Sequence, residues 1–258
     1  MALLRGLRSF AAVVLVGLYF VLGSVVLRLL VVPGCWVLPA RRPLLTSVYM
    51  KGMAAGIVAL LTLGGARFRR VGRLPTAEPV LVIANHQSLL EILQIALLSR
   101  PRVPAYATRR RYARFVPLVS QTMRLLGCPI IDPRRDPHGA VAAIRRGARE
   151  LRHGLVIFAE GHRSRDGAIR PFRSAGVQAV LEERRMPVFL VLNEGSWRVR
   201  RFVDLLFRVH LIDAVSEAIG PFEAPQDPSG VPAFVEDMRA RLVRRLDEIR
   251  GVAPLSAA

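Results

Sequence analysis

The segment PVLVIANHQSLLE, residues 79–91, predicts the fold of the chain. Residues 79–84 form a continuous apolar run, which is typical of strands covered on both faces of a sheet. Polar residues follow directly, and the order Ser-Leu-Leu-Glu at residues 88–91 has the form of a capping box. It predicts a helix over residues 88–99 with Ser88 as its N-cap. A buried strand that leads straight into a helix is the repeating unit of an α/β fold.

The same alternation continues on the C-terminal side of this segment. Apolar runs predict further strands, and apolar positions at helical spacing predict further helices. The predicted strands cover residues 103–107, 128–131, 155–159, 187–192 and 208–212, and the predicted helices cover residues 115–126, 139–152, 173–185 and a last stretch that includes Phe234, Met238, Leu242, Leu246 and Ile249 and ends before Gly251. We therefore expect an α/β fold, with a central, mostly parallel or mixed sheet flanked by helices.

The region before residue 66 has a different composition. Residues 9–27 carry no charge, and as a helix they would reach about 28 Å, close to the thickness of the hydrocarbon core of a membrane. Residues 43–65 carry only Lys51. We expect an apolar helical pair that spans or lies on a membrane, with a cleaved signal peptide as the alternative. The predicted division is a membrane-associated pair at 1–65, a catalytic domain at 66–251 and a flexible tail at 252–258.

The formal net charge of +19 indicates an anionic neighbourhood, either nucleic acid or a membrane surface with phosphorylated ligands. The apolar N-terminal region and the lack of a nucleic-acid-binding motif argue against nucleic acid. Arginines flank the apolar segments, which places the catalytic domain on the cytoplasmic face of a bacterial-type inner membrane. Cys35 and Cys128, the two cysteines, suggest neither a disulfide framework nor a metal site.

A second polar segment, FAEGHRS at residues 158–164, also follows an apolar run. Ligands of α/β folds bind outside the carboxyl ends of strands, so this segment and the one after residue 84 are expected to be two halves of one site. In the first half, a neutral His86 could remove a proton from a hydroxyl if a carboxylate held its other ring nitrogen. Glu91 is placed to do so. The alternatives are a structural histidine and a glutamate that only caps its helix.

The second half has the residue types of an anion site. Glu160 supplies a carboxylate, Gly161 permits close approach of the backbone, and Arg163 supplies a guanidinium suited to bidentate contact with phosphate. A merely solvated, charged loop is the alternative. Asp132 with Arg134 and Arg135 forms another candidate anion-binding corner at a strand end, unless it is an ordinary Asp-Pro turn.

The order and spacing of these segments resemble the glycerolipid acyltransferase family, whose best-known members are the 1-acylglycerol-3-phosphate acyltransferases. The resemblance rests on Asn85-His86-Gln87-Ser88 with an acid five residues after the histidine, on Glu160-Gly161 with Arg163-Ser164, and more weakly on residues 127–132 and Met186-Pro187-Val188. It extends over about residues 68–219.

The resemblance implies direct transfer of a fatty acyl group from a thioester, acyl-CoA or acyl-carrier protein, to the hydroxyl of a lysophospholipid. By its motifs, His86 would be the general base and Glu91 its carboxylate partner. The phosphorylated acceptor would be held by a set of residues around the second half: Glu160, Gly161, His162, Arg163, Ser164 and Arg134. The resemblance implies no metal and no prosthetic group. The expected partners are the acceptor, the acyl donor and membrane lipids, without nucleic acid.

Three residues depart from the family pattern. Glu91 stands where the family has an aspartate, His162 replaces the threonine of Glu-Gly-Thr-Arg-Ser, and Pro133 replaces an arginine. Two further hypotheses therefore stay open. One is an acyltransferase for another lysolipid or a non-glycerol lipid, and the other is a non-catalytic lipid-binding or scaffolding relative.

Overall fold

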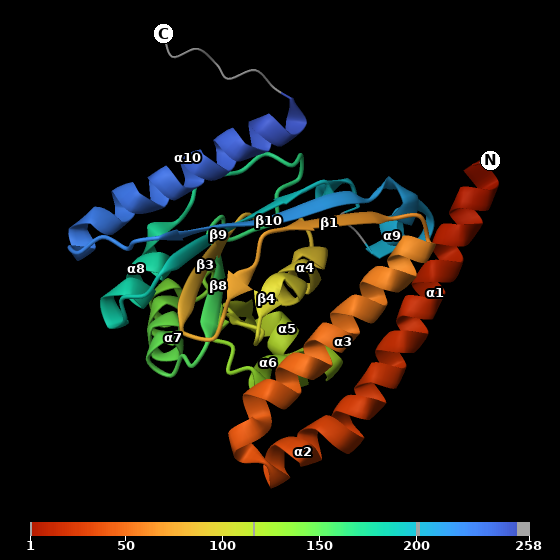
Figure 1. The fold of residues 1–258 in the computed structure, drawn as a ribbon, viewed down its shortest axis with the longest axis horizontal. Helices are drawn as coiled ribbons and strands as arrows, with labels where there is room; N and C mark the ends of the chain where they lie inside the picture. The colour runs from red at the N-terminus through yellow and green to blue at the C-terminus, as the bar shows by residue number, and fades with distance from the viewer. Residues whose placement is uncertain (1, 116, 200–201, 252–258) are drawn as a thin grey trace.

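A central six-stranded sheet forms the middle of the molecule in the computed structural model, which describes residues 2–115, 117–199 and 202–251 (Figure 1). The strand order is β1-β10-β9-β3-β8-β5. Neighbouring strands run parallel except β10 and β9. The sheet strands are β1 (Arg67–Val71), β3 (Val80–Ala84), β5 (Ala105–Tyr106), β8 (Gly154–Phe158), β9 (Val188–Glu194) and β10 (Asp213–Phe222). This confirms the predicted fold class.

Helices cover both faces of the sheet, and two short strand pairs lie beside it. The helices of the domain are α4 (Leu90–Leu98), α5 (Arg110–Phe115), α6 (Pro117–Leu125), α7 (Pro137–Arg149), α8 (Ser174–Glu183), α9 (Phe202–Arg208) and α10 (Val231–Arg250), with short 3-10 turns at η3 (Ser196–Arg198), η4 (Val209–Leu211) and η5 (Pro228–Gly230). The strand pairs are β2 (Leu74–Pro75) with β4 (Ser99–Arg100), and β6 (Thr108–Arg109) with β7 (Ile130–Ile131). Helix α4 packs between the sheet and the N-terminal helices, whereas α8 and α10 pack on the other side (Figure 1).

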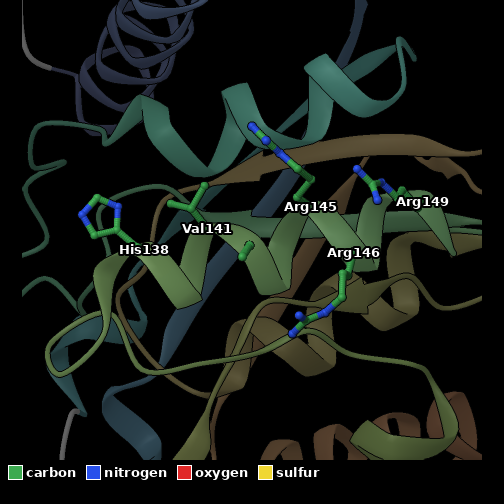
Figure 2. A pocket seen from close by; sticks show the side chains of 6 residues that line it. His138, Val141, Arg145, Arg146 and Arg149 are labelled. Carbon is green, nitrogen blue, oxygen red and sulfur yellow. The ribbon is translucent and has the colours of Figure 1, made fainter.

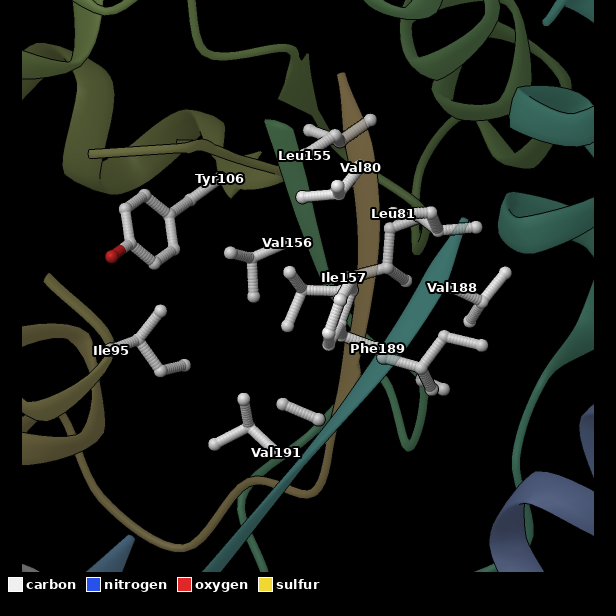
Figure 3. Packing of buried hydrophobic residues seen from close by; sticks show 14 of the residues in the cluster. Val80, Leu81, Ile95, Tyr106, Leu155, Val156, Ile157, Val188, Phe189 and Val191 are labelled. Atoms are coloured by element: carbon white, nitrogen blue, oxygen red, sulfur yellow. The ribbon is translucent and has the colours of Figure 1, made fainter. Parts of the chain in front are cut away.

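The core lies around β3, which is buried along its whole length. Side chains of β3, β8 and β9 pack against Ile95 of α4 and Tyr106 of β5 (Figure 3). Burying one such large apolar side chain contributes about 1.5–3 kcal/mol. In the register of the sheet, Ala84 lies opposite both Phe158 and Val191. The carboxyl ends of β3, β8 and β9 are therefore held side by side.

The N-terminal region forms two long helical stretches. The first comprises α1 (Ala2–Val26), a π-helical segment η1 (Leu27–Val31) and α2 (Val32–Val37), and the second comprises η2 (Pro39–Arg41) and α3 (Arg42–Leu63). Both stretches are long and apolar enough to cross a membrane. Many large apolar side chains of α1 are exposed, including Leu18, Val21 and Leu22.

Polar contacts attach this helical pair to the α/β domain. Arg42 donates hydrogen bonds to the carbonyls of Arg124 and Leu125 at the end of α6, at 2.9 and 3.2 Å. Lys51 donates to the carbonyl of Pro101 at 2.5 Å. The charge that interrupts the second apolar segment therefore faces the domain.

The predicted strand over residues 208–212 is wrong. Residues 209–211 form the 3-10 turn η4, and the strand β10 begins only at Asp213. β10 was missed because it pairs on both sides but buries only part of its length, so it lacks a continuous apolar run. The edge strand β1 was missed in an arginine-rich stretch for the same reason.

Two helix starts also differ from the prediction. Helix α4 begins at Leu90 with Leu89 as N-cap, so Ser88 precedes the helix. Helix α7 begins at Pro137, because the Asp136 side chain accepts a hydrogen bond from the Gly139 amide at 2.7 Å and caps it. The predicted tail, residues 252–258, lies outside the described residues, and the domain division at residue 65 stays a prediction.

Candidate active site

The two polar segments predicted to share a site lie side by side. The β3–α4 loop and the loop after β8 are joined by hydrogen bonds in both directions. The His86 amide donates to Glu160 Oε1 at 2.8 Å, and the Ser164 amide donates to the His86 carbonyl at 2.6 Å. The Ala159 amide donates to the carbonyl of Ala84 at 3.3 Å. The second loop thus continues the pairing of β3 and β8 beyond the end of the sheet.

His86 is paired with Glu91. Its Nδ1 lies 2.7 Å from Glu91 Oε2, and the imidazole stacks on the Phe158 ring with centroids 4.1 Å apart. An ionised carboxylate only accepts hydrogen bonds, so it favours the tautomer with the proton on Nδ1. The Nε2 atom then carries a lone pair. It has no hydrogen-bond partner among the described residues, and the side chain is 16 % exposed. His86 is therefore arranged to accept a proton from a ligand.

The second oxygen of Glu91 is occupied as well. Glu91 Oε1 accepts hydrogen bonds from the amides of Gln87 and Ser88, at 2.7 and 2.5 Å, and from the Ser196 hydroxyl at 3.0 Å. The side chain is only 2 % exposed. One carboxylate thus stabilises the start of α4 and orients the imidazole. The capping interpretation and the orienting interpretation are both compatible with this geometry.

Glu160 lies beneath the loop, away from solvent. It is 1 % exposed, and its Oε2 accepts a hydrogen bond from the Arg170 amide at 3.0 Å while Oε1 holds His86. Burial raises the pKa of this carboxyl, and the two amide hydrogen bonds oppose that rise. With both oxygens engaged by backbone, Glu160 is placed to position the His86 loop. The direct substrate contact expected of Glu160 stays a prediction.

Ser164 is also turned inward. It is buried, its amide holds the His86 carbonyl, and its hydroxyl donates to Asp166 Oδ1 at 3.1 Å. The substrate contact expected of Ser164 likewise stays a prediction.

The exposed rim of the site is basic. The side chain of Arg163 is half-buried and that of Arg134 is exposed; neither has a polar partner within the described parts of the chain. His162 is exposed beside them. Gly161 adopts a φ of +70°, which glycine tolerates best, and its carbonyl accepts a hydrogen bond from Arg109. The predicted anion-binding residues thus line one rim, except for the two inward-facing side chains.

Two further arginines belong to this rim, beyond those that the resemblance assigned to the acceptor. Arg109 is half-buried at the end of β6, and Arg173 runs alongside Gly161. Burial lowers the pKa of Arg109, as do Arg111, Arg134 and Arg173. Such crowding of like charges favours an anionic ligand. The position of Arg109 at the end of a strand was the available sequence signal.

A second buried network supports the site from below. The Glu194 carboxylate at the end of β9 accepts hydrogen bonds from Gln87 Nε2 at 2.9 Å and from Arg250 Nη2 at 2.8 Å. Burial raises the pKa of Glu194, but the hydrogen bonds from Arg250 and Gln87 outweigh it and hold the pKa below its ordinary value. Asn85 pairs through its side chain with the backbone of Asn193, at 2.7 and 2.8 Å. These residues extend the contact between β3 and β9. Asn85 and Gln87 belong to the motif Asn85-His86-Gln87-Ser88, whereas no motif indicated Asn193, Glu194 or Arg250.

A hollow of about 360 Å³ lies elsewhere, on the outer face of α7 (Figure 2). It is lined by His138, Val141, Ala142, Arg145, Arg146 and Arg149 and contains none of the predicted site residues. Over the residues that the structure describes, no group of three or more His, Cys, Asp or Glu side chains could hold a metal ion.

Comparison with known proteins relates part of the chain to a family. Residues 66–191 match the family model described as Acyltransferase. The 1-acyl-sn-glycerol-3-phosphate acyltransferase of Saccharomyces cerevisiae is 26 % identical over 183 residues, which cover 69 % of this chain and 58 % of that protein. The enzyme of the same name from Cocos nucifera is 31 % identical over 121 residues, covering 45 % and 38 % respectively. The chain thus spans less than two thirds of the length of these curated relatives.

A solved structure supports the fold over the whole length. The 1-acyl-sn-glycerophosphate (LPA) acyltransferase PlsC from Thermotoga maritima superposes with a TM-score of 0.68 at 20 % identity, covering 100 % of both chains. At this identity the likeness shows the fold. The family model and the relatives agree, and residues 66–191 therefore carry an Acyltransferase domain.

Proposed function

We propose that the protein transfers a fatty acyl group from an acyl thioester to the free hydroxyl of a lysophospholipid. The proposed acceptor is 1-acylglycerol-3-phosphate and the product phosphatidic acid. The observation that carries this proposal is the Nδ1–Glu91 pairing of His86, which leaves Nε2 available beside a rim of arginines. The names of the relatives point to the same acceptor.

In the proposed reaction, Nε2 of His86 takes the proton of the acceptor hydroxyl as its oxygen attacks the thioester carbonyl. Glu91 stabilises the imidazolium that forms. The C–S bond then breaks, and the proton passes to the departing thiolate, so that ester and free thiol are the products. Each of these steps uses only protein side chains and the two substrates, so we propose that no metal or prosthetic group takes part.

The arginine rim is proposed to hold the acceptor phosphate. Arg163 and Arg134 have no partner in the part of the chain that the structure describes, and Arg109 has a guanidinium that shares its surroundings with other cations. A phosphate would relieve this repulsion and fix the hydroxyl near His86. Gly161 and the exposed His162 complete the rim.

The two apolar helical stretches are proposed to hold the domain at a bilayer surface, with the site on the cytoplasmic face of a bacterial-type inner membrane. The acceptor and the acyl chain would enter from the lipid, and acyl-CoA or acyl-carrier protein would supply the donor. Because His162 stands beside Arg163 in place of the family threonine, an acyltransferase for another lysolipid or a non-glycerol lipid is the second candidate.

The test is an acyl-transfer assay on membranes containing the full chain, with lysophosphatidic acid and a panel of other lysolipids, and with both donor types. His86→Ala is expected to lower turnover about 10²–10⁴-fold, the usual contribution of a positioned general base. The exposed His138 on α7 provides a matched control, and His138→Ala should leave turnover unchanged.

Two results would count against the proposal. Equal turnover of His86→Ala and the original protein would show that His86 is not the general base. Transfer to no acceptor, with lipid binding intact, would favour the non-catalytic scaffolding relative.

A further inference from the structure

A second basic hollow lies where the N-terminal helices meet the sheet. It has a volume of about 320 Å³ and is lined by Arg5, Arg8, Gly64-Gly65, Arg67 and His210. These residues come from the start of α1, the end of α3, the start of β1 and the turn η4. None of them belongs to the candidate active site.

The side chain of His210 is held in place in this hollow. His210 Nδ1 shares a hydrogen bond of 3.3 Å with Ser9, which is fully buried, and this contact fixes the ring. His210 Nε2 has no hydrogen-bond partner among the described residues. A Cβ on Gly65, whose φ is +102°, would come within 3.1 Å of the His210 Cβ. Glycine therefore suits this position, because of its positive φ and the close approach to His210.

The charge in this hollow is largely uncompensated. Arg8 donates through Nε to the Leu63 carbonyl, which leaves its terminal nitrogens for other contacts, and Arg5 has no polar partner in the described ranges. The nearby acid is Asp213, which pairs with Arg67 at 3.1 Å. In the α7 hollow, by contrast, Arg145 and Arg149 are already paired with Glu182 and Glu183. The hollow beside α1 is thus the better anion site of the two.

Apolar side chains surround these cations. Leu4 and Leu7 of α1 and Leu211 of η4 are exposed, and Phe10 stacks on Phe207 with ring centroids 6.0 Å apart. A phosphate bound by the arginines would lie next to an apolar surface that continues along α1. This combination matches a phospholipid, with an anionic headgroup and acyl chains, better than it matches a free anion.

The position of the hollow fits the same ligand. Because β10 runs antiparallel to β9, its first residue lies at the carboxyl end of β9, and β1 starts at that end too. The hollow and His86 therefore share one end of the sheet. They are three strands apart in the order β3-β9-β10-β1, which corresponds to about 15 Å. A bilayer surface that reaches the active site is thus within reach of this hollow as well.

We infer that the hollow formed by Arg5, Arg8, Arg67 and His210 binds the phosphate of an anionic glycerophospholipid of the membrane, separately from the acceptor. The bound lipid would hold this end of the sheet at the headgroup layer. This inference concerns binding and does not depend on the transfer reaction.

The test uses the full chain in phosphatidylcholine nanodiscs, with phosphatidylglycerol added as the probe and its binding measured by native mass spectrometry. The pocket variant is Arg5→Gln with Arg67→Gln, which leaves the Arg8 contact to α3 in place. The control is Arg152→Gln with Arg244→Gln, two exposed arginines elsewhere whose removal changes the net charge equally. The pocket variant should bind phosphatidylglycerol about 30-fold more weakly, since each of its two lost arginines contributes about 1 kcal/mol near an anionic surface. The control should change by less than twofold.

An equal loss of phosphatidylglycerol binding in both variants would show general charge attraction and would overturn the proposed site. Unchanged binding in both variants would overturn it as well. Inorganic phosphate and coenzyme A form a further arm. If either soluble ligand displaces phosphatidylglycerol at micromolar concentration and loses that ability in the pocket variant, the hollow is a site for a soluble phosphate and the lipid assignment fails.

Discussion

The two halves of the candidate site differ in how their side chains are held. On the side of the buried residues, Glu91 accepts from four donors and Glu160 from two backbone amides, so that His86 is held from both ends. On the rim, Arg163 and Arg134 extend without a partner in the described structure. The groups proposed to react are thus preorganised, whereas those proposed to recognise the acceptor are left to be ordered by it. A rigid reacting centre with an adaptable rim would keep the chemistry constant while the acceptor changes.

The largest effect expected from this contrast is that of Glu91→Gln. The glutamine oxygen can keep the amides of Gln87 and Ser88, which turns its NH₂ group toward His86 Nδ1. The imidazole must then carry its proton on Nε2 and cannot accept another. Turnover should fall about 10³-fold, while the free energy of unfolding changes little. Acyl transfer and denaturant unfolding are measured on the same preparation.

Glu91→Asp is the matched variant, because it keeps the charge and shortens the side chain. Turnover should stay well above that of Glu91→Gln. If both variants retain full turnover per folded molecule and lose only stability, Glu91 caps the helix and does not orient His86.

Glu160→Gln should mainly affect stability. One of its two backbone hydrogen bonds would be replaced by a contact between two donors in a buried place, at a cost of about 2 kcal/mol in the free energy of unfolding. The acceptor KM should stay constant, because Glu160 faces the backbone and not the rim. A raised acceptor KM with an unchanged free energy of unfolding would indicate that Glu160 contacts the substrate directly.

On the rim, Arg163→Lys should raise the acceptor KM up to about tenfold through loss of a bidentate phosphate contact, with kcat and stability unchanged. Arg165→Lys is the control, since Arg165 is exposed on the same loop. An unchanged acceptor KM in Arg163→Lys would show that Arg163 makes no bidentate contact with the acceptor phosphate. Equal increases in both variants would point to the general charge of the loop.

The smallest expected effect concerns the network around Glu194 below the site. It is measured as the dependence of the free energy of unfolding on pH. The pKa of Glu194 is held below its ordinary value of 4.5, so its ionised form stabilises the folded protein above that pH. This contribution, about 1 kcal/mol, is lost as the pH falls below 4.5 and through the lowered pKa. Glu194→Gln should flatten the dependence of unfolding free energy on pH in that range. An unaltered slope would assign the acid sensitivity to other carboxyls.

The alternation of apolar runs with helical patterns was enough to predict the sheet, because β3, β8 and β9 are buried on both faces. β1 and β10 were missed because partly exposed strands depend on pairing with distant partners. The pairing of Arg67 with Asp213, for example, joins residues far apart in the chain. No local pattern contains that information.

The candidate site was likewise predictable only where its residues are close in the sequence. Local spacing predicted His86 with Glu91, since both lie on one strand–helix junction. The inward turn of Glu160 could not be predicted, because it depends on the amide of Arg170 in a loop whose path is set by the rest of the fold. Arg109 and Arg250 were missed because they reach the site from β6 and from the end of α10.

The contacts of Arg42 and Lys51 bear on how the α/β domain would face a bilayer. Both side chains reach from α3 to backbone carbonyls of the domain, one at the end of α6 and one at Pro101. A flexible tether would let the domain tumble above the lipid and present its site in any direction. These bonds instead hold the helical pair against the domain, so that the tilt of the helices in a membrane would set the height and direction of the candidate site.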